Sequence, residues 1–208
     1  MAIEVWLAFV AASAILLVIP GPTVLLVISY AVGQGWRAAG PMAAGVALGD
    51  FTAMTLSMLG VGALLATSAA LFAALKWIGA AYLIWLGIRL WRAGATLAAE
   101  PRQAAASRAR MLGHAWLVTA LNPKSITFFV AFLPQFLDPA RDFYAQMLVC
   151  EVTFLALAFA NAFGYALAAS RGRVLVRGPR ALGLINKAGA TALIAAGVAA
   201  ATAQAARN

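Results

Sequence analysis

A helix-breaking tripeptide, Pro20-Gly21-Pro22, interrupts an apolar run that extends from Val5 to Val32. A proline has no backbone N–H, and its ring clashes with the carbonyl one turn earlier. If the run is helical, the carbonyls of Leu16 and Val18 therefore lose their usual hydrogen-bond donors. In hydrocarbon each unsatisfied backbone group is costly, so such a break is stable only where protein or a watery cavity satisfies it. The tripeptide predicts either a discontinuous membrane helix at a substrate site or a kink that only shapes packing.

The composition is that of an integral membrane protein. Of the 208 residues, 64% are hydrophobic and 10% are charged, whereas about a quarter of the residues of soluble domains are charged. The length leaves room for about six helices that each span a hydrocarbon core about 30 Å thick. Glu4 is the only charge before Arg37, so the first apolar run is expected to be a membrane span and not a cleavable signal.

Several classes of function are disfavoured by what the sequence contains. The single cysteine, Cys150, excludes an internal disulfide and a multi-cysteine metal site, and it is expected to be a small buried hydrophobe. The net charge of +9 comes from arginines gathered in particular loops, and no nucleic-acid motif is present. The chain also lacks the HExxH and GxSxG motifs of enzymes. We expect no enzymatic activity, cofactor or resident metal.

Six membrane helices are expected, without any strand. They lie at about residues 3–30, 39–66, 72–91, 113–137, 143–169 and 182–203. The first is broken at Pro20-Gly21-Pro22 and the fourth at Asn122-Pro123-Lys124. Gly45 and Gly49 stand at the GxxxG spacing that allows helices to approach closely. Residues 93–112 form the one long polar stretch and are predicted to be a cytoplasmic connecting loop.

The distribution of basic residues predicts the orientation of these six spans. The first, third and fifth loops hold ten lysines and arginines, whereas the opposite side holds three. Because cytoplasmic loops carry the excess of positive charge, both termini are predicted to be extracytoplasmic.

The two halves of the chain repeat one pattern. Asp50 follows Pro22 by 28 positions, and Glu151 follows Pro123 by 28 positions. Further along each half, a lysine stands at the start of the next span. It is Lys76 in the first half and Lys187 in the second. Because each half has three spans, the second half enters from the opposite side of the membrane. The chain is therefore predicted to be two inverted three-helix repeats, residues 1–92 and 113–208, which is an architecture of secondary transporters with the site between the halves.

Charged groups inside the spans are the candidates for chemistry. A charge at the bilayer centre costs about 2.5 to 3.5 kcal/mol on the most lenient scale, so these groups face a cavity, pair or titrate. Lys124 begins the second half of a broken helix, where free amides and the helix dipole already favour an anion such as a carboxylate. Asp50 and Glu151 are candidates to bind an ammonium group or carry protons. The alternatives are a structural Asp50–Lys124 ion pair and pairing of Glu151 with Lys187.

Other polar residues have simpler explanations. Asn122 and Asn161 are expected to cap or bridge backbone groups freed by the breaks, and for Asn161 hydrogen bonding without ligand contact is favoured. Lys76 and Lys187 are expected to extend toward the interface, and His114 is expected to lie at the loop edge.

Motifs along nearly the whole chain resemble those of the LysE/RhtB amino-acid exporters. They are Pro20-Gly21-Pro22, Gly45 to Gly49-Asp50, Lys76 with Gly79-Ala80-Ala81-Tyr82-Leu83 and Gly87, Asn122-Pro123-Lys124, Phe128-Phe129 and Leu133-Pro134-Gln135-Phe136. The last span, rich in alanine, is uninformative. Carried over by position, the family's functional motifs fall on Pro20, Gly21, Pro22, Asp50, Asn122, Pro123 and Lys124.

The resemblance implies a six-helix protein of the bacterial inner membrane that exports amino acids or close derivatives. Members differ among threonine, homoserine, lysine and leucine. It further implies a homodimer and transport driven by the proton gradient. Our hypothesis for such transport is that a proton enters in exchange on Asp50 or Glu151. Two alternatives remain, efflux of a divalent cation and a membrane scaffold without transport. Two acids within the membrane and one peripheral histidine are a poor set of ligands for a divalent cation.

Overall fold

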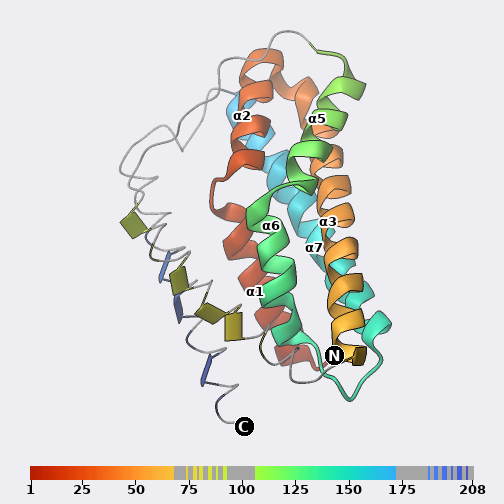
Figure 1. The fold of residues 1–208 in the computed structure, drawn as a ribbon. Helices are drawn as coiled ribbons and strands as arrows, with labels where there is room; N and C mark the ends of the chain where they lie inside the picture. The colour runs from red at the N-terminus through yellow and green to blue at the C-terminus, as the bar shows by residue number, and fades with distance from the viewer. Residues whose placement is uncertain are drawn as a thin grey trace.

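The structure is a computed structural model that describes residues 1–67 and 106–171, together with single helical residues within 74–92 and 187–205. The expected third and sixth spans and most of the expected loop 93–112 lie outside the continuously described residues. Every regular element in the described part is helical (Figure 1). The elements are α1 (Ile3–Val18), α2 (Pro22–Gln34), the 3-10 turn η1 (Gly35–Ala38), α3 (Ala39–Thr67), α5 (Arg108–Ala120), α6 (Pro123–Thr127), the π-helical turn η2 (Phe128–Phe132), the 3-10 turn η3 (Leu133–Phe136) and α7 (Phe143–Ser170).

Both predicted helix breaks are present, and local chemistry explains their positions. α1 ends at Val18, and α2 begins at Pro22 with Gly21 before it. α5 ends at Ala120, and α6 begins at Pro123. Proline suits the first position of a helix because the N–H that it lacks would have no partner there. The Asn122 side chain accepts a hydrogen bond from the Lys124 N–H at 3.0 Å and so caps α6.

Two boundaries differ from the sequence-based expectation. α2 ends at Gln34, whereas the first span was expected to end at about residue 30. α5 begins at Arg108, inside the segment that was expected to be a loop. The Ser107 hydroxyl accepts a hydrogen bond from the Arg110 N–H at 3.2 Å, so this serine caps the helix. α3 and α7 end within one residue of the expected bounds.

The broken helices run side by side in opposite directions (Figure 1). α1 and α2 lead away from the end that holds the N-terminus, and α3 returns toward it after η1. α5, α6, η2 and η3 also run toward that end, and α7 runs away from it. α3 packs against α5 and α7, and α7 packs against α1 and α2.

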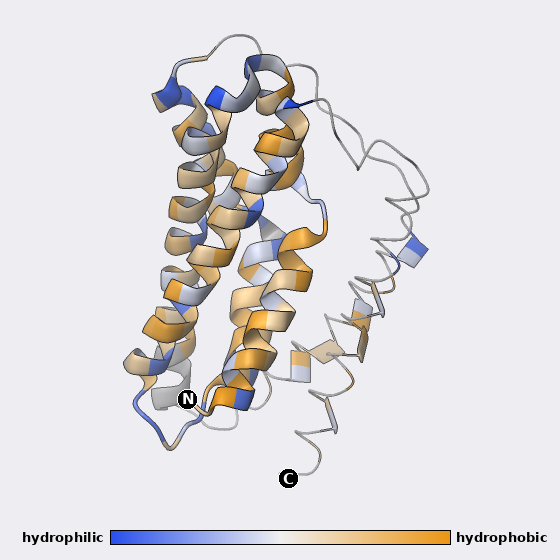
Figure 2. Cartoon of the chain, turned by 180° about the vertical axis from the view of Figure 1, so that it is seen from behind, coloured by the Kyte–Doolittle hydropathy of each residue, from blue (hydrophilic) through white to orange (hydrophobic). Residues whose placement is uncertain are grey.

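The outer surface of these helices suits a membrane. Two helical stretches, Pro22–Val61 and Phe143–Ser170, are long and apolar enough to cross a bilayer. α5 and the segment Lys124–Phe136 provide a third if this pair, bent by 46° at its break, is one span. Large apolar side chains such as Leu56 and Leu148 are exposed, and hydrophilic residues gather mainly at the ends of the bundle (Figure 2).

The GxxxG glycines hold α3 against α5. A Cβ atom at Gly49 would lie 2.6 Å from the Thr119 Cβ and 2.7 Å from the Trp116 carbonyl. A Cβ at Gly45 would overlap the Leu112 carbonyl. Only glycine permits this backbone separation, so the spacing noted in the sequence marks the α3–α5 contact.

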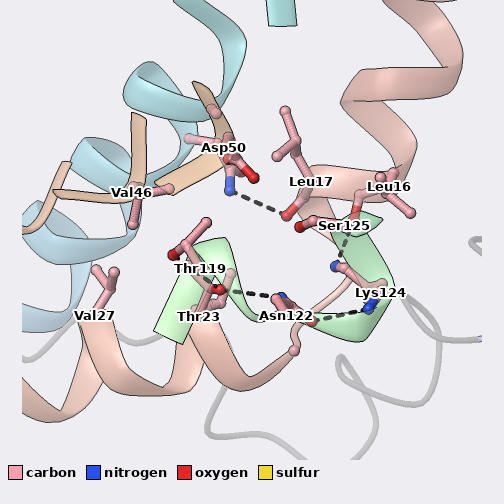
Figure 3. A pocket seen from close by; sticks show the side chains of 15 residues that line it. Leu16, Leu17, Thr23, Val27, Val46, Asp50, Thr119, Asn122, Lys124 and Ser125 are labelled. Carbon is pink, nitrogen blue, oxygen red and sulfur yellow. Dashed lines mark hydrogen bonds between the residues drawn. The ribbon is translucent and has the colours of Figure 1, made fainter. Parts of the chain in front are cut away.

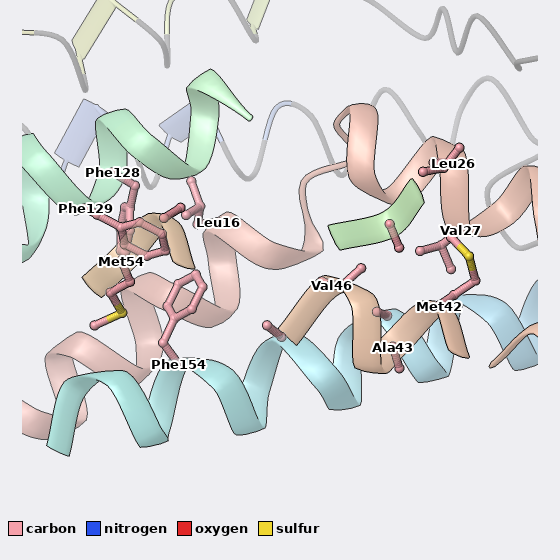
Figure 4. Packing of buried hydrophobic residues seen from close by; sticks show 14 of the residues in the cluster. Leu16, Leu26, Val27, Met42, Ala43, Val46, Met54, Phe128, Phe129 and Phe154 are labelled. Atoms are coloured by element: carbon pink, nitrogen blue, oxygen red, sulfur yellow. The ribbon is translucent and has the colours of Figure 1, made fainter. Parts of the chain in front are cut away.

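Apolar side chains fill the interior on both sides of the two breaks (Figure 4). Toward the η1 end these include Val27, Met42 and Val46. Toward the other end, an aromatic cluster of Phe128, Phe129 and Phe154 packs with Leu16 and Met54. The breaks therefore lie between two apolar layers.

Candidate functional site

Lys124 satisfies carbonyls that the first break leaves without donors. Its Nζ donates a hydrogen bond to the carbonyl oxygen of Leu16 (Figure 3) and another to that of Ile19, both at 2.9 Å. The Leu16 carbonyl is one of the two that Pro20 and Pro22 were expected to deprive of a partner. An ammonium group has three donors, so these two bonds leave one N–H of Lys124 for another acceptor.

Two side chains of α7 satisfy the remaining carbonyls at the end of α1. The Tyr165 hydroxyl donates to the Val18 carbonyl at 2.8 Å, and the Asn161 amide donates to the Leu17 carbonyl at 3.0 Å. The expected loss of donors at Leu16 and Val18 is thus confirmed, and the compensation comes entirely from the second half of the chain.

A second group of hydrogen bonds joins the two breaks directly. The Asn122 amide donates to the Thr23 hydroxyl at 3.1 Å, and the Thr119 hydroxyl donates to the same oxygen at 3.3 Å (Figure 3). Thr23 lies at the start of α2, whereas Thr119 and Asn122 flank the end of α5. Asn122 therefore caps a backbone N–H at its own break, as the sequence suggested, and also joins the two breaks through the Thr23 side chain.

A small cavity lies where the breaks meet. Its volume is about 30 Å³, which is room for one or two water molecules because a water occupies about 10–15 Å³ on this measure. The lining includes Leu16, Leu17, Gly21, Thr23, Val24, Val27, Val46, Asp50, Thr119, Asn122, Lys124, Ser125, Ala158, Asn161 and Ala162. We call it the central cavity. It is too small for an amino acid, so any such ligand requires the helices around it to separate.

Asp50 and Lys124 approach the central cavity from different helices (Figure 3). Asp50 is only 2% exposed and interacts with the Ser125 hydroxyl and with the charge of Lys124. One of its carboxylate oxygens, Oδ1, has no hydrogen-bond partner in the described part of the chain. The two charges form no direct ion pair with each other, since the one ion pair among the described residues joins Arg141 and Asp138. The direct ion pair considered from sequence is therefore not formed, although the two charges still interact with each other.

The predicted site residues are only partly brought together. Gly21, Asp50, Asn122 and Lys124 line the central cavity, whereas Pro20 and Pro22 shape the break without lining it. The side chain of Pro123 lies outside the described residues.

Glu151 lies away from this site. It is buried, and its Oε1 accepts a hydrogen bond from the Thr55 hydroxyl at 2.6 Å. The alternative partner, Lys187, is exposed and lies 5.9 Å from the centre of the Trp91 ring. No ion pair between Glu151 and Lys187 occurs among the described residues, and Lys76 lies outside them. The described residues also bring together no group of three or more His, Cys, Asp or Glu that would hold a metal ion.

The sequence analysis did not identify Thr23, Ser125 or Tyr165 as residues of this site. For Thr23 and Tyr165, however, the sequence contains a pattern that points to them. Thr23 directly follows Pro22, as Lys124 directly follows Pro123, so the repeat itself pointed to Thr23. Tyr165 stands four residues after Asn161, one turn along the same helix face. Ser125 had no such signal, since its role depends on how α6 lies against α3.

His114 lies deeper than expected. It belongs to α5 and is half-buried, and its Nδ1 is 3.0 Å from the hydroxyl of the buried Tyr30. The contact joins α2 and α5 on the η1 side of the breaks.

These features define a helical membrane protein in which two broken helices enclose a charged central cavity. The sequence matches the family described as LysE type translocator over residues 14–204, and the chain belongs to this family. The resemblance noted from its motifs is thereby confirmed.

Several related proteins align with this chain over most of their length. An uncharacterized membrane protein of Vibrio cholerae is 40% identical over 206 residues, which cover 99% of this chain and 100% of the relative. A homoserine/homoserine lactone efflux protein of Salmonella typhi is 36% identical, with 90% and 91% covered. A leucine efflux protein of Klebsiella pneumoniae is 31% identical, with 71% and 72% covered. No solved structure matches the chain significantly.

Proposed function

We propose that this protein exports an amino acid or a close derivative across the bacterial inner membrane. The efflux functions of the named relatives support this substrate class. The observation that carries the proposal is the central cavity itself, which has a buried carboxylate from α3 and a half-buried lysine from α6 in its lining. Two opposite charges facing one space suit a zwitterion, which brings one group of each sign.

In this proposal each charge recognises one end of the substrate. The substrate carboxylate takes the remaining donor of Lys124, and the substrate ammonium binds Asp50, whose Oδ1 has no partner in the described residues. Asn122 and Gly21 border the same space. The prolines Pro20, Pro22 and Pro123 act indirectly, by placing the two breaks.

Export is proposed to be coupled to proton entry by alternating access. Asp50 is the better candidate for the proton carrier because it lines the central cavity, whereas Glu151 is bonded to Thr55 outside the lining. A membrane potential of 100 mV contributes about 2.3 kcal/mol for each charge moved, so one proton per cycle supports a substantial gradient. The size of the central cavity supports a cycle in which the site opens to one side at a time.

The proposed architecture completes the described helices to six spans in two inverted repeats. Residues 1–92 and 113–208 are the repeats, residues 93–112 are the cytoplasmic connection, and both termini are extracytoplasmic. The opposite directions of the two broken helices support this arrangement (Figure 1). A homodimer is proposed from the family resemblance alone.

The site assignment is tested with two substrates that differ in one group. Homoserine carries a carboxylate and an ammonium, whereas its lactone carries the ammonium only. Proteoliposomes are loaded with either compound under an imposed pH gradient. We expect Lys124→Gln, which keeps N–H donors for the α1 carbonyls, to lower export of homoserine by about tenfold, the effect of losing about 1.4 kcal/mol of binding. Lactone export should change much less, and Asp50→Asn should lower both.

The matched control is Lys187→Gln, the same substitution at an exposed lysine away from the central cavity. It should leave both fluxes unchanged. No gradient-dependent flux of any amino acid would reject the export function. A folded Lys124→Gln protein that exports both compounds normally would reject the site while leaving the function intact.

A further inference from the structure

A second cavity lies at the end of the bundle that holds the N-terminus. Its volume is about 220 Å³, and its lining comes from the start of α1, from η3 and the following turn, and from the first turns of α7. Met1, Val5, Phe136, Asp138, Arg141 and Gln146 are among the lining residues. We call it the end cavity. It is several times larger than the central cavity and lies on the extracytoplasmic side in the proposed orientation.

Two chain segments connect the central cavity to the end cavity. On α1, Leu16 borders the central cavity, and Val5 borders the end cavity. On α6 and its continuation, Ser125 borders the first and Phe136 borders the second. The space between the cavities is therefore bounded by the stretch of α1 from residue 5 to 16 and by the stretch 125–136.

Aromatic rings fill the region between the two cavities. Phe128 and Phe132 have ring centres 4.9 Å apart, Phe132 and Phe136 are 5.0 Å apart, and Phe136 meets Phe9 of α1 at 5.4 Å. Phe129 packs on Phe154 of α7 at 4.9 Å. These rings, which we call the aromatic barrier, centre on the π-helical turn Phe128–Phe132. Single π-helical turns inside helices occur frequently at functional sites.

Ser13 is a polar residue within this apolar layer. It shares the buried face of α1 with Phe9 and Leu16, so it lies between the ring that meets Phe136 and the residue that borders the central cavity. Ser13 is 0% exposed, and its hydroxyl has no hydrogen-bond partner among the described residues. A buried hydroxyl without a partner costs free energy. In the described residues the only other buried side-chain atom in this condition is Asp50 Oδ1, which faces the central cavity.

We propose that the exported molecule leaves the central cavity past Ser13 and through the aromatic barrier into the end cavity. Ser13 is then a transient binding residue that hydrogen-bonds a small zwitterion while the aromatic barrier is open. The hydroxyl suits this role because it can donate to a carboxylate and accept from an ammonium group. This route rests on the export function and orientation proposed above.

The route is tested by thiol labelling from the extracytoplasmic side. In a Cys150→Ala background, Ser13→Cys is treated with a small membrane-impermeant methanethiosulfonate reagent, with and without saturating homoserine. We expect labelling that accelerates severalfold with homoserine, because transport opens the aromatic barrier. The control is Ala11→Cys, on the exposed face of the same helix turn. It should stay unlabelled, since a thiol in lipid does not form the reactive thiolate.

A second measurement separates a transport role from a packing role. Ser13→Ala should lower the maximal rate of export severalfold with little change in KM, and Ser13→Thr should restore it. If Ser13→Cys is labelled no faster than Ala11→Cys in any condition while the Cys150→Ala parent still exports, the route is wrong and the export function stands. If the wild-type protein exports no amino acid, the export function fails, and the proposed route fails with it.

Discussion

At the scale of single residues, the first break is stabilised by side chains from the other half of the chain. The carbonyls of residues 16 to 19 accept hydrogen bonds from Lys124, Asn161 and Tyr165. In hydrocarbon these carbonyls would otherwise be unsatisfied. Lys124 thus has two tasks, because the ammonium that supports the break also borders the central cavity. A substrate carboxylate that attracts Lys124 would compete with the end of α1, which offers a direct link between binding and movement of the helices.

Tyr165→Phe should destabilise the protein without changing any charge. It removes only the hydroxyl that donates to Val18. Val18 is 45% exposed, and lipid offers its carbonyl no replacement donor, so the loss should cost on the order of 1–3 kcal/mol. Denaturant unfolding in detergent measures the loss. Tyr144→Phe is the matched control, because Tyr144 is 67% exposed, and its unfolding midpoint should not move. Equal stability of the two variants would show that the Val18 contact contributes nothing.

At the scale of elements, close contact between α3 and α5 sets the position of Asp50. Gly49 precedes Asp50 and lies against Thr119 and Trp116, and Thr119 in turn donates to Thr23 at the break. The glycines therefore control how near the acid of one half comes to the broken helix of the other. A change in this contact is expected to alter both stability and the shape of the central cavity.

Gly49→Ala should push α3 and α5 apart. Its Cβ would lie 2.6 Å from the Thr119 Cβ, and overpacking of this kind costs about 1–3 kcal/mol. The melting temperature in detergent and the export rate should both fall. Gly60→Ala in the same helix is the control, because nothing lies within 4 Å of a Cβ at that position. An unchanged melting temperature for Gly49→Ala would contradict the close packing described here.

At the scale of the whole molecule, the described helices enclose their charged site between two apolar layers. The aromatic barrier lies on one side, and Val27, Met42 and Val46 lie on the other (Figure 4). In the proposed export cycle, a site covered by these two layers would have to open to one side at a time, which requires a conformational change. Under that proposal, the orientation of the bundle decides which end is the exit.

Single cysteines test that orientation. In the Cys150→Ala background, Glu4→Cys should react with a membrane-impermeant thiol reagent added outside cells. Arg37→Cys should react only when the reagent is given access to the cytoplasmic face of the membrane. Both positions are exposed. Glu4 lies in the first turn of α1 and Arg37 lies in η1, and α1 and α2 lead from the N-terminal end of the bundle to the opposite end (Figure 1). The expected pattern follows from the excess of basic residues in the odd-numbered loops. The reverse pattern would invert the topology and make the end cavity an entrance.

The sequence alone determined the features that depend on local backbone chemistry. Proline lacks an N–H wherever it stands, so Pro20, Pro22 and Pro123 located both breaks and identified the carbonyls of Leu16 and Val18. The run of apolar residues located α3 and α7 because hydrophobicity is a property of the residues themselves. The motifs at these breaks also identified the family correctly.

Only the tertiary structure decided which groups meet. The spacing of residues in the sequence does not indicate that Lys124 donates hydrogen bonds to two carbonyls 105 and 108 positions away. It also does not indicate that Glu151 accepts a hydrogen bond from Thr55, or that Asp50 and Lys124 line one cavity without forming a direct ion pair. The sequence also gives no sign that the Ser13 hydroxyl lacks a hydrogen-bond partner among the described residues. Hydrogen bonds and packing act over a few ångströms in space, and the separation between residues along the chain does not specify that distance until the helices have packed.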